Sequence, residues 1–381
     1  MAALAGGARS MRTVRRLLYR DIVWSVVFVT AAFLSLFYFI DFVDEIDGIG
    51  RNGYTVLHAA AGCVLEMPGH FYELFPISVL IGTIYSMARL AQSSEYTILR
   101  TGGLGPGRAL RLLAILGIAF AAITFVVGDF LAPITEREAV LMKAGFRGGL
   151  QLGRAGAWLK ERRVTEDGER AISVNVARVS SSGELQEVRI FELDTDSRLR
   201  SRIEAKRGRV DADAVWRLTD VERIDWPTPE QASAGASVKI VRLPELVWSS
   251  TLGAGVVAAA LLPVSTMSTV DLWRYSTHLS GQDQAAQRHE IQFWKKALYP
   301  LACLVMVGLA LPFAYMHARA GGVSLKVFGG IMLGISFVLL NNVSGHLGIL
   351  RDWTPWVVAA TPGMVYLGLS MAAFAWLVRF R

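Results

Sequence analysis

The stretch Ile22-Val-Trp-Ser-Val-Val-Phe-Val-Thr-Ala-Ala-Phe-Leu-Ser-Leu-Phe-Tyr-Phe-Ile40 contains 19 residues without a charge. About 20 apolar helical residues cross a hydrocarbon core about 30 Å thick, so this stretch predicts a membrane-spanning helix. Arginines precede it, and it ends at Asp41 without a small-residue cleavage site. We therefore expect an uncleaved membrane anchor and not a signal peptide.

Five further apolar segments have the length of membrane spans. They lie within residues 55–88 and at residues 112–128, 297–316, 327–350 and 353–378. A seventh segment, residues 246–270, is also free of charge, but it is rich in Ser and Thr and contains Pro263. Its continuous apolar part, residues 256–262, is typical of a buried strand rather than a span.

The distribution of charge decides between six and seven spans. With six spans and the N-terminus inside, the cytoplasmic pieces hold 13 Lys and Arg against two acidic residues, a net charge of +11. The rest of the chain then carries −4 of the overall +7, in accordance with the positive-inside rule. A seventh span would place Arg319, Lys326, Arg379 and Arg381 outside. We therefore predict six spans with both termini cytoplasmic, and the net charge indicates topology rather than nucleic-acid binding.

A water-soluble block separates the third span from the fourth. Residues 132–289 carry 22 basic and 21 acidic residues. Short alternating segments between Asp-Gly and Ser-Gly turns predict strands, at residues 157–159, 171–179, 185–193, 199–210, 214–226 and 237–243. About six to eight strands predict an antiparallel sandwich or jelly roll outside the membrane, and residues 266–279 predict a helix after it. The predicted fold is an α-helical polytopic membrane protein, three spans plus three, with an inserted all-β domain.

Several kinds of active site are absent from the sequence. The chain has no GxxxxGK[ST] motif and no Gly-Lys dipeptide, so it carries no P-loop of its own. It also has no HExxH, GxSxG or Cys/His metal-binding pattern, and Cys63 and Cys303 lie in apolar runs as expected of packing residues. We predict no catalytic residue, metal or cofactor on this chain.

Polar residues inside the spans are the remaining candidates. Glu66 and Glu73 lie in the second predicted span, where a charge is costly and therefore indicates function. Glu66 and His70 are four residues apart and share a helical face, so either a structural or cavity role or proton transfer is open. If the chain were instead a polytopic enzyme acting on envelope lipids, Glu66, Glu73, His70 and Asp129 would be its catalytic groups.

Several motifs resemble one known family. They are Phe42-Val-Asp-Glu-Ile, Phe75-Pro-Ile-Ser-Val-Leu-Ile-Gly, Leu90-Ala-Gln-Ser-Ser-Glu-Tyr, Thr101-Gly-Gly, Ala132-Pro-Ile-Thr-Glu, Ser280-Gly-Gln-Asp, Phe293-Trp-Lys-Lys and Gly334-Ile-Ser-Phe. Over about residues 11–378 the chain resembles the lipopolysaccharide export ABC transporter permeases of the LptF/LptG family, and the LptG branch more closely.

The resemblance implies a permease in the bacterial inner membrane that extracts lipopolysaccharide and passes it toward the outer membrane. It implies cytoplasmic residues 1–21, spans one to three within 22–131, a periplasmic β-jellyroll-like domain with a terminal helix at 132–289, and spans four to six within 290–381. The implied partners are an LptF-like permease, a dimeric LptB-like ATPase that holds ATP and Mg²⁺, a single-span LptC-like subunit and a periplasmic LptA-like bridge. An ABC permease for lipoproteins or another envelope substrate has the same sequence features and stays open.

The resemblance also implies roles for particular residues. A cytoplasmic coupling helix at about residues 88–102 would contact the ATPase, with Glu95 matching the family's characteristic Glu and Ala91, Leu99 and Gly102 beside it. Phe33, Phe37 and Phe337 would line a cavity for the lipid acyl chains.

The end of the first span departs from the family. Members often carry Lys there, facing lipid phosphates, whereas this chain has Asp41, Asp44, Glu45 and Asp47, whose like charge would repel phosphate. Lys143 matches a family Arg and is the predicted headgroup contact instead, with Arg137 and Arg147 nearby. Divalent cations that bridge the acidic residues to phosphate are a further hypothesis.

Overall fold

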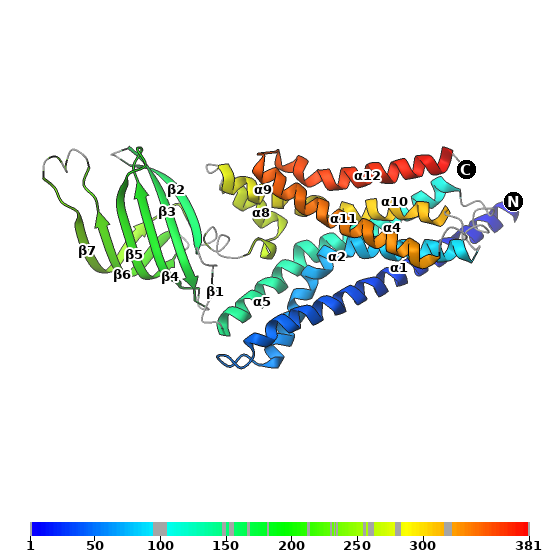
Figure 1. The fold of residues 1–381 in the computed structure, drawn as a ribbon, viewed down its shortest axis with the longest axis horizontal. Helices are drawn as coiled ribbons and strands as arrows, with labels where there is room; N and C mark the ends of the chain where they lie inside the picture. Colours follow the sequence, from blue (N-terminus) through cyan, green and yellow to red (C-terminus); the bar gives the residue numbers. More distant parts are fainter. Residues whose placement is uncertain are drawn as a thin grey trace.

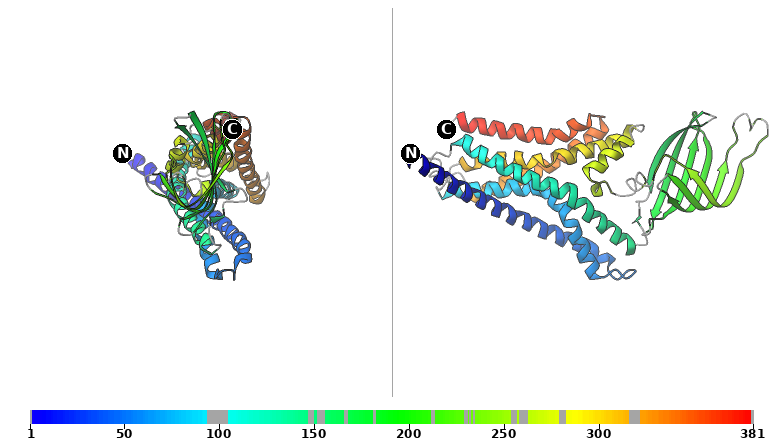
Figure 2. Two further views of the ribbon diagram at one scale, coloured as in Figure 1. Left: turned by 90° about the vertical axis from the view of Figure 1, so that its left-hand side faces the viewer. Right: turned by 180° about the vertical axis from the view of Figure 1, so that it is seen from behind.

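A helical body and a β domain make up the molecule (Figure 1). The computed structural model describes residues 2–93, 105–146, 150–151, 156–165, 168–180, 183–211, 214–228, 231, 233, 235–253, 257, 263–278, 283–315 and 322–379. Both chain termini lie at one end of the helical body and the β domain lies at the other (Figures 1 and 2). This arrangement agrees with an odd number of spans on each side of the insertion.

The first half of the chain builds three long helices. α1 covers Ala2–Glu45 and is followed by the short helix η1, Ile46–Gly48, while α2 covers Val56–Gln92. α4, Pro106–Val126, continues through the π-helical turn η2, Val127–Leu131, into α5, Ala132–Phe146. The third helix is therefore much longer than the apolar segment at 112–128, because it continues as α5 through the more polar residues 132–146.

The second half returns through α8, Thr269–His278, and continues with α9, Asp283–Leu298, α10, Leu301–Tyr315, α11, Val323–Leu350, and α12, Pro355–Arg379. In the described residues five helices are long and apolar enough to cross a membrane, and the pair α9 and α10, bent by 51°, makes a sixth. α10 has 15 residues and reaches only about 22 Å at 1.5 Å per residue. The fourth predicted span therefore needs the last turns of α9 to cross a bilayer.

Glycines let α2 lie at the centre of the helical body. A Cβ added at Gly82 of α2 would lie 2.7 Å from the backbone of Val26 in α1. On the other side, Cβ atoms added at Gly330 and Gly334 of α11 would lie 2.7 Å from Ile84 and 2.5 Å from Ile77 of α2. Close approach at small residues replaces the hydrophobic effect as the cause of helix packing in lipid. Accordingly, 78% of the most apolar window of α2 is buried, against 11% for α1.

The β domain is one antiparallel sheet inserted between α5 and α8. Its strands are β1 Leu150–Gln151, β2 Ala157–Thr165, β3 Gly168–Val179, β4 Leu185–Leu193, β5 Leu199–Val210, β6 Val215–Asp225 and β7 Lys239–Ser249. β3 to β7 pair in chain order, and β1 and β2 both pair with β3. The predicted all-β insertion is confirmed, and each of the six strands predicted between residues 157 and 243 overlaps an observed one.

One line across the sheet breaks the alternation of inward and outward side chains. In each of five strands two successive inward-facing residues are three apart instead of two, and the pairing register places these steps side by side. The steps are Val176 to Val179, Leu185 to Val188, Ala205 to Gly208, Leu218 to Val221 and Leu243 to Leu246. The register does not shift at these steps, so the extra residues of neighbouring strands lie opposite one another. Aligned steps therefore bend the five strands β3 to β7 along one line.

The inner face of the bent sheet carries the hydrophobic core of the β domain. Trp216 is fully buried there, and its indole Nε1 donates to the Leu252 carbonyl at 3.0 Å. Val257 belongs to the same core, and its N–H donates to the Gly253 carbonyl at 3.1 Å. This is a helix-like turn, so the predicted strand at 256–262 is not seen at Val257, and the rest of that strand lies outside the described residues.

Candidate functional site

Three helices bring titratable side chains together at the end of the helical body that carries the β domain. Asp41 and Glu45 come from the last turns of α1, Glu66 and His70 from α2, and Lys143 from α5. We call these five residues the three-helix cluster. The sequence predicts three separate features here, the acidic end of the first span, the pair Glu66 and His70, and Lys143, whereas the structure brings them together in one site.

Lys143 is the centre of the three-helix cluster. Its Nζ lies 2.6 Å from Glu66 Oε1 and 2.9 Å from Glu45 Oε1. The hydroxyl of Tyr54 donates to the other oxygen of Glu45 at 3.2 Å. The lysine and Glu45 side chains are only 15% and 10% exposed, and that of Glu66 is 27% exposed. One shielded ammonium therefore ties α5 to both α1 and α2.

A second contact joins α1 to α2 in the same cluster. His70 Nε2 lies 2.7 Å from Asp41 Oδ2, and the His70 ring packs 5.0 Å from the ring of Phe37. Asp44 and Asp47 are exposed. Two of the four acidic side chains at the end of α1 thus have a partner within the chain: Glu45 contacts Lys143 and Asp41 contacts His70.

Two glycines of α2 make room for α5. A Cβ at Gly69 would lie 1.9 Å from Glu136 Oε1, and a Cβ at Gly62 would lie 3.2 Å from the Cε of Lys143. The nearest atoms that such a Cβ would meet are the ends of long side chains of α5. The glycines therefore leave space for the side chains of Glu136 and Lys143 against α2.

The other predicted headgroup residues lie apart from this cluster. Arg137 is exposed and lies six residues before Lys143 on α5, which points it to a different face of the helix. Arg147 lies outside the described residues. Among the residues that the structure describes, no group of three His, Cys, Asp or Glu is arranged to hold a metal ion.

The three predicted cavity phenylalanines have different surroundings. Phe33 and Phe37 are half-buried on α1. Phe337 of α11 is 3% exposed and packs between the rings of Tyr299 and Tyr366, at 6.5 and 5.2 Å. α2 lies between α1 and α11 (Figure 1). Within one chain these side chains therefore do not form one wall.

The groups of the alternative enzyme hypothesis do not converge either. Glu66 binds Lys143 and His70 binds Asp41, whereas Asp129, in η2, accepts the backbone N–H of Thr269 at 2.7 Å. The side chain of Glu73 is exposed. A catalytic site needs its polar groups around one reacting atom. Glu66 and His70 share the three-helix cluster, but each is held by its own ion-pair partner there, and Asp129 binds the start of α8 outside the cluster.

Sequence reasoning missed a second polar site, formed by the paired lysines at the end of α9. Lys295 Nζ donates to the Asn341 carbonyl of α11 at 2.7 Å, and Lys296 Nζ donates to the Met267 carbonyl at 2.5 Å. A Cβ at Gly345 would lie 2.5 Å from Lys295 Nζ, so this glycine leaves space for the ammonium. The signal in the sequence is a pair of lysines directly before an apolar segment, in the family motif Phe293-Trp-Lys-Lys.

The predicted coupling segment begins where α2 ends. Ala91 is half-buried in the last turn of α2, which ends at Gln92, and Glu95, Leu99 and Gly102 lie outside the described residues. At this end Arg89 of α2 donates to Asp21 of α1 at 2.6 Å. The described part therefore shows α1 and α2 joined immediately before the segment.

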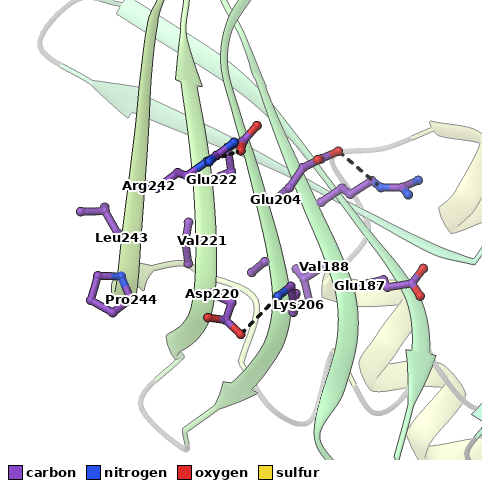
Figure 3. A pocket seen from close by; sticks show the side chains of 12 residues that line it. Glu187, Val188, Glu204, Lys206, Asp220, Val221, Glu222, Arg242, Leu243 and Pro244 are labelled. Atoms are coloured by element: carbon purple, nitrogen blue, oxygen red, sulfur yellow. Dashed lines mark hydrogen bonds and ion pairs between the residues drawn. The ribbon is translucent and has the colours of Figure 1, made fainter.

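The sheet carries an open groove of about 630 Å³ along its line of three-residue steps (Figure 3). Its charged walls are paired: Arg242 with Glu222 at 2.9 Å, Arg189 with Glu204 at 3.6 Å and Lys206 with Asp220 at 3.7 Å. Glu187 also lines the groove and pairs with Arg178 outside it. The groove therefore has only one more acidic than basic side chain. It is a weaker candidate than the three-helix cluster.

Comparison with known proteins gives a consistent result over nearly the whole chain. The family model described as "Lipopolysaccharide export system permease LptF/LptG" matches residues 16–378. The lipopolysaccharide export system permease protein LptG of Escherichia coli K12 is 25% identical over 359 residues, which cover 93% of this chain and 96% of that protein. LptG of Haemophilus influenzae is 23% identical over 360 residues, 94% of this chain and 96% of that protein.

Proposed function

This chain belongs to the LptF/LptG family of lipopolysaccharide export permeases, and on that premise we propose that it extracts lipopolysaccharide from the bacterial inner membrane with energy from a separate ATPase. The match over residues 16–378, which includes both halves of the helical body and the whole β domain, carries the proposal. As a member of a permease family it is a membrane transport subunit and not an enzyme. The lipoprotein and enzyme alternatives lack a comparable observation.

The energy source is expected on other chains. The sequence has no P-loop, so a dimeric cytoplasmic ATPase would bind ATP and Mg²⁺ and contact the segment that follows α2. Glu95 in that segment is the proposed contact. Because Arg89 and Asp21 join α1 to α2 just before it, a push on this segment would reach both helices.

The orientation follows from charge. The end of the helical body that carries the termini includes Arg15, Arg16 and Arg20, and the positive-inside rule supports a cytoplasmic position for this end and a periplasmic one for the β domain. An LptF-like permease would complete the lipid cavity beside Phe33 and Phe37. Single-span and bridge subunits of the LptC and LptA kinds would then receive lipopolysaccharide near the β domain.

The three-helix cluster is the proposed headgroup site, with Lys143 as the residue that contacts phosphate. In the structure two carboxylates hold its ammonium, at 2.6 and 2.9 Å. A phosphate would therefore have to replace a carboxylate, and Glu66 is the more exposed of the two. Such an exchange would release α2 from α5 when lipid enters, and restore the contact when lipid leaves.

Purification of the native complex tests this proposal. The tagged chain is isolated in mild detergent, and the proteins and lipids that accompany it are identified by mass spectrometry. An ATPase together with lipopolysaccharide is the expected result. Absence of both, or turnover of a lipid by the isolated chain, would contradict the proposed function.

Glu95→Ala tests the coupling contact separately. We expect the variant to fold but to lose the ATPase, or to retain it without stimulation by lipopolysaccharide. Glu138→Ala is the matched control, because it removes an exposed carboxylate from α5 and should leave the ATPase bound and coupled. An undiminished, fully coupled ATPase with Glu95→Ala would exclude the assigned contact.

A further inference from the structure

α8, Thr269–His278, connects the β domain to the fourth span and has two distinct faces. Leu272, Tyr275 and Ser276 are buried, at 1%, 7% and 8% exposed. The opposite face carries Val270 and Trp273, 51% and 57% exposed, together with exposed Arg274 and Thr277. These four positions follow the spacing i, i+3, i+4 and i+7 of one helical face.

The contacts of the buried face of α8 show where this helix lies along the length of the helical body. The Tyr275 ring packs 4.7 Å from that of His289 on α9. Two residues earlier on α9, the side-chain amide of Gln287 donates to the Trp353 carbonyl at 3.4 Å. α8 therefore lies beside the loop between α11 and α12, at the β-domain end of the helical body (Figure 1).

The N-terminus of α8 is fastened to two other helices. Asp129 of η2 accepts the Thr269 N–H at 2.7 Å, and Lys296 of α9 donates to the Met267 carbonyl at 2.5 Å. A carboxylate at the first N–H groups of a helix also meets the positive end of its dipole. The helix is thus held in place independently of the β domain that precedes it.

Exposed tryptophans give the position of the bilayer. In α12, Trp356 and Trp376 are 56% and 60% exposed, and 20 residues at 1.5 Å each separate them by about 30 Å, the thickness of a hydrocarbon core. Trp gathers at both interfaces of a membrane. Trp353 and Trp356 then mark the interface at the β-domain end, which is the level of α8.

The helix formed by α4 and η2 gives the same position for the boundary of the bilayer. Asp129 lies 18 residues after Arg111 in the continuous helix of α4 and η2, a rise of about 27 Å. If Arg111 lies at the cytoplasmic surface, Asp129 and the N-terminus of α8 lie at the opposite one. Two independent helices therefore place α8 at the boundary between lipid and water.

We propose that α8 is an interfacial membrane anchor whose exposed face binds the phospholipid surface on the β-domain side. Trp273 and Val270 enter the boundary between headgroups and acyl chains, where an aromatic ring with one polar atom is favoured. Arg274 beside them lies at the level of the lipid phosphates, to which a guanidinium binds in bidentate fashion. α8 then holds the base of the β domain at a fixed height above the bilayer.

Spin-label accessibility tests the anchor in the full-length chain. Trp273→Cys and Val270→Cys, each spin-labelled, are placed in nanodiscs of phosphatidylethanolamine and phosphatidylglycerol, together with any subunits that accompany the chain. The control is Val247→Cys, because Val247 is 66% exposed on β7 of the β domain. Cys63 and Cys303 are both fully buried, and the unsubstituted chain measures any label that they take up.

Collision with oxygen, which concentrates in lipid, is compared with collision with a water-soluble nickel complex. Residues 270 and 273 should both favour oxygen, while residue 247 favours nickel. Preference for nickel at 270 and 273 would show that this face lies in water. Exclusion of both reagents would show that a protein covers it. Either result would overturn the proposal, and the second variant keeps the test valid if Trp273→Cys fails to fold.

Discussion

The three-helix cluster of the helical body and the groove of the β domain use ion pairs in opposite ways. In the groove of the sheet, the Arg242 and Glu222 side chains are paired at 2.9 Å but are 83% and 37% exposed. In the three-helix cluster, Lys143 holds Glu45 and Glu66 with side chains that are 15%, 10% and 27% exposed. Exposed pairs contribute little because water screens them, whereas removal of one partner of a shielded pair leaves a costly charge. The ion-pair distances in the two regions are similar, so the exposure of the side chains to water decides how much each pair contributes to stability.

The largest effect is expected from Lys143→Met. It leaves the carboxylates of Glu45 and Glu66 facing each other without a cation, which should lower the free energy of unfolding by about 3–5 kcal/mol. Thermal unfolding in detergent measures the loss. A variant as stable as the unsubstituted chain would show that the cluster is solvated like the surface of the sheet.

A glycine substitution tests how tightly the helical body holds its second lysine site. Gly345→Ala would bring a methyl group within 2.5 Å of Lys295 Nζ, and we expect a loss of about 1–3 kcal/mol from the strain. Gly363→Ala in α12 is the matched control, since a Cβ there meets nothing within 4 Å. That change should be neutral or slightly stabilising, by up to about 1 kcal/mol. Equal melting temperatures for the two variants would refute close packing at Gly345.

The line of three-residue steps predicts that a substitution to glycine can stabilise the β domain. Glu187 has a φ of +54°, a conformation that costs a non-glycine residue about 1–2 kcal/mol. Glu187→Gly should therefore raise the unfolding temperature even though it removes an ion pair with Arg178. Glu204→Gly, on the neighbouring strand at an ordinary φ, should lower the unfolding temperature. A loss of stability at Glu187→Gly would contradict the strain at this line.

The smallest effect is expected from Arg242→Ala, which removes the exposed pair with Glu222. The change in unfolding free energy should be about 0.2–1 kcal/mol and should disappear in high salt. If Arg242→Ala destabilised the chain as much as Lys143→Met, the contrast between the two regions would be wrong.

Hydrophobic patterns predicted most of the fold, because lipid-facing helices and half-buried strands impose clear periodicities. The fourth span was placed at 297–316, but α10 begins only at Leu301 after a bend. The last turns of α9 complete this span, but the charges of its two lysines exclude these turns from an apolar segment. The carbonyl groups that bind the two ammonium groups cannot be recognised from the sequence. Residues 132–146 were likewise placed in the β domain, although they continue the third helix.

The candidate site was only partly predictable. The sequence indicates Glu66 as a charge inside a span, whereas Lys143 and Asp41 are indicated only by comparison with the family's motifs. Their pairing depends on the packing of α1, α2 and α5 against one another, in which Gly62 and Gly69 leave space for side chains of α5. The three-residue steps of the sheet were visible as apolar spacing, for example from Val176 to Val179, but only the register shows that they align. Long-range geometry of this kind is not encoded in a local pattern.

ATP-driven extraction of lipopolysaccharide from proteoliposomes tests the central claim most directly. The purified complex of this chain with its ATPase is reconstituted with labelled lipopolysaccharide, and transfer to a soluble periplasmic acceptor is followed. We predict transfer that requires ATP hydrolysis and stops when this chain is omitted. ATP hydrolysis without transfer, or transfer at the same rate without ATP, would contradict the proposed function.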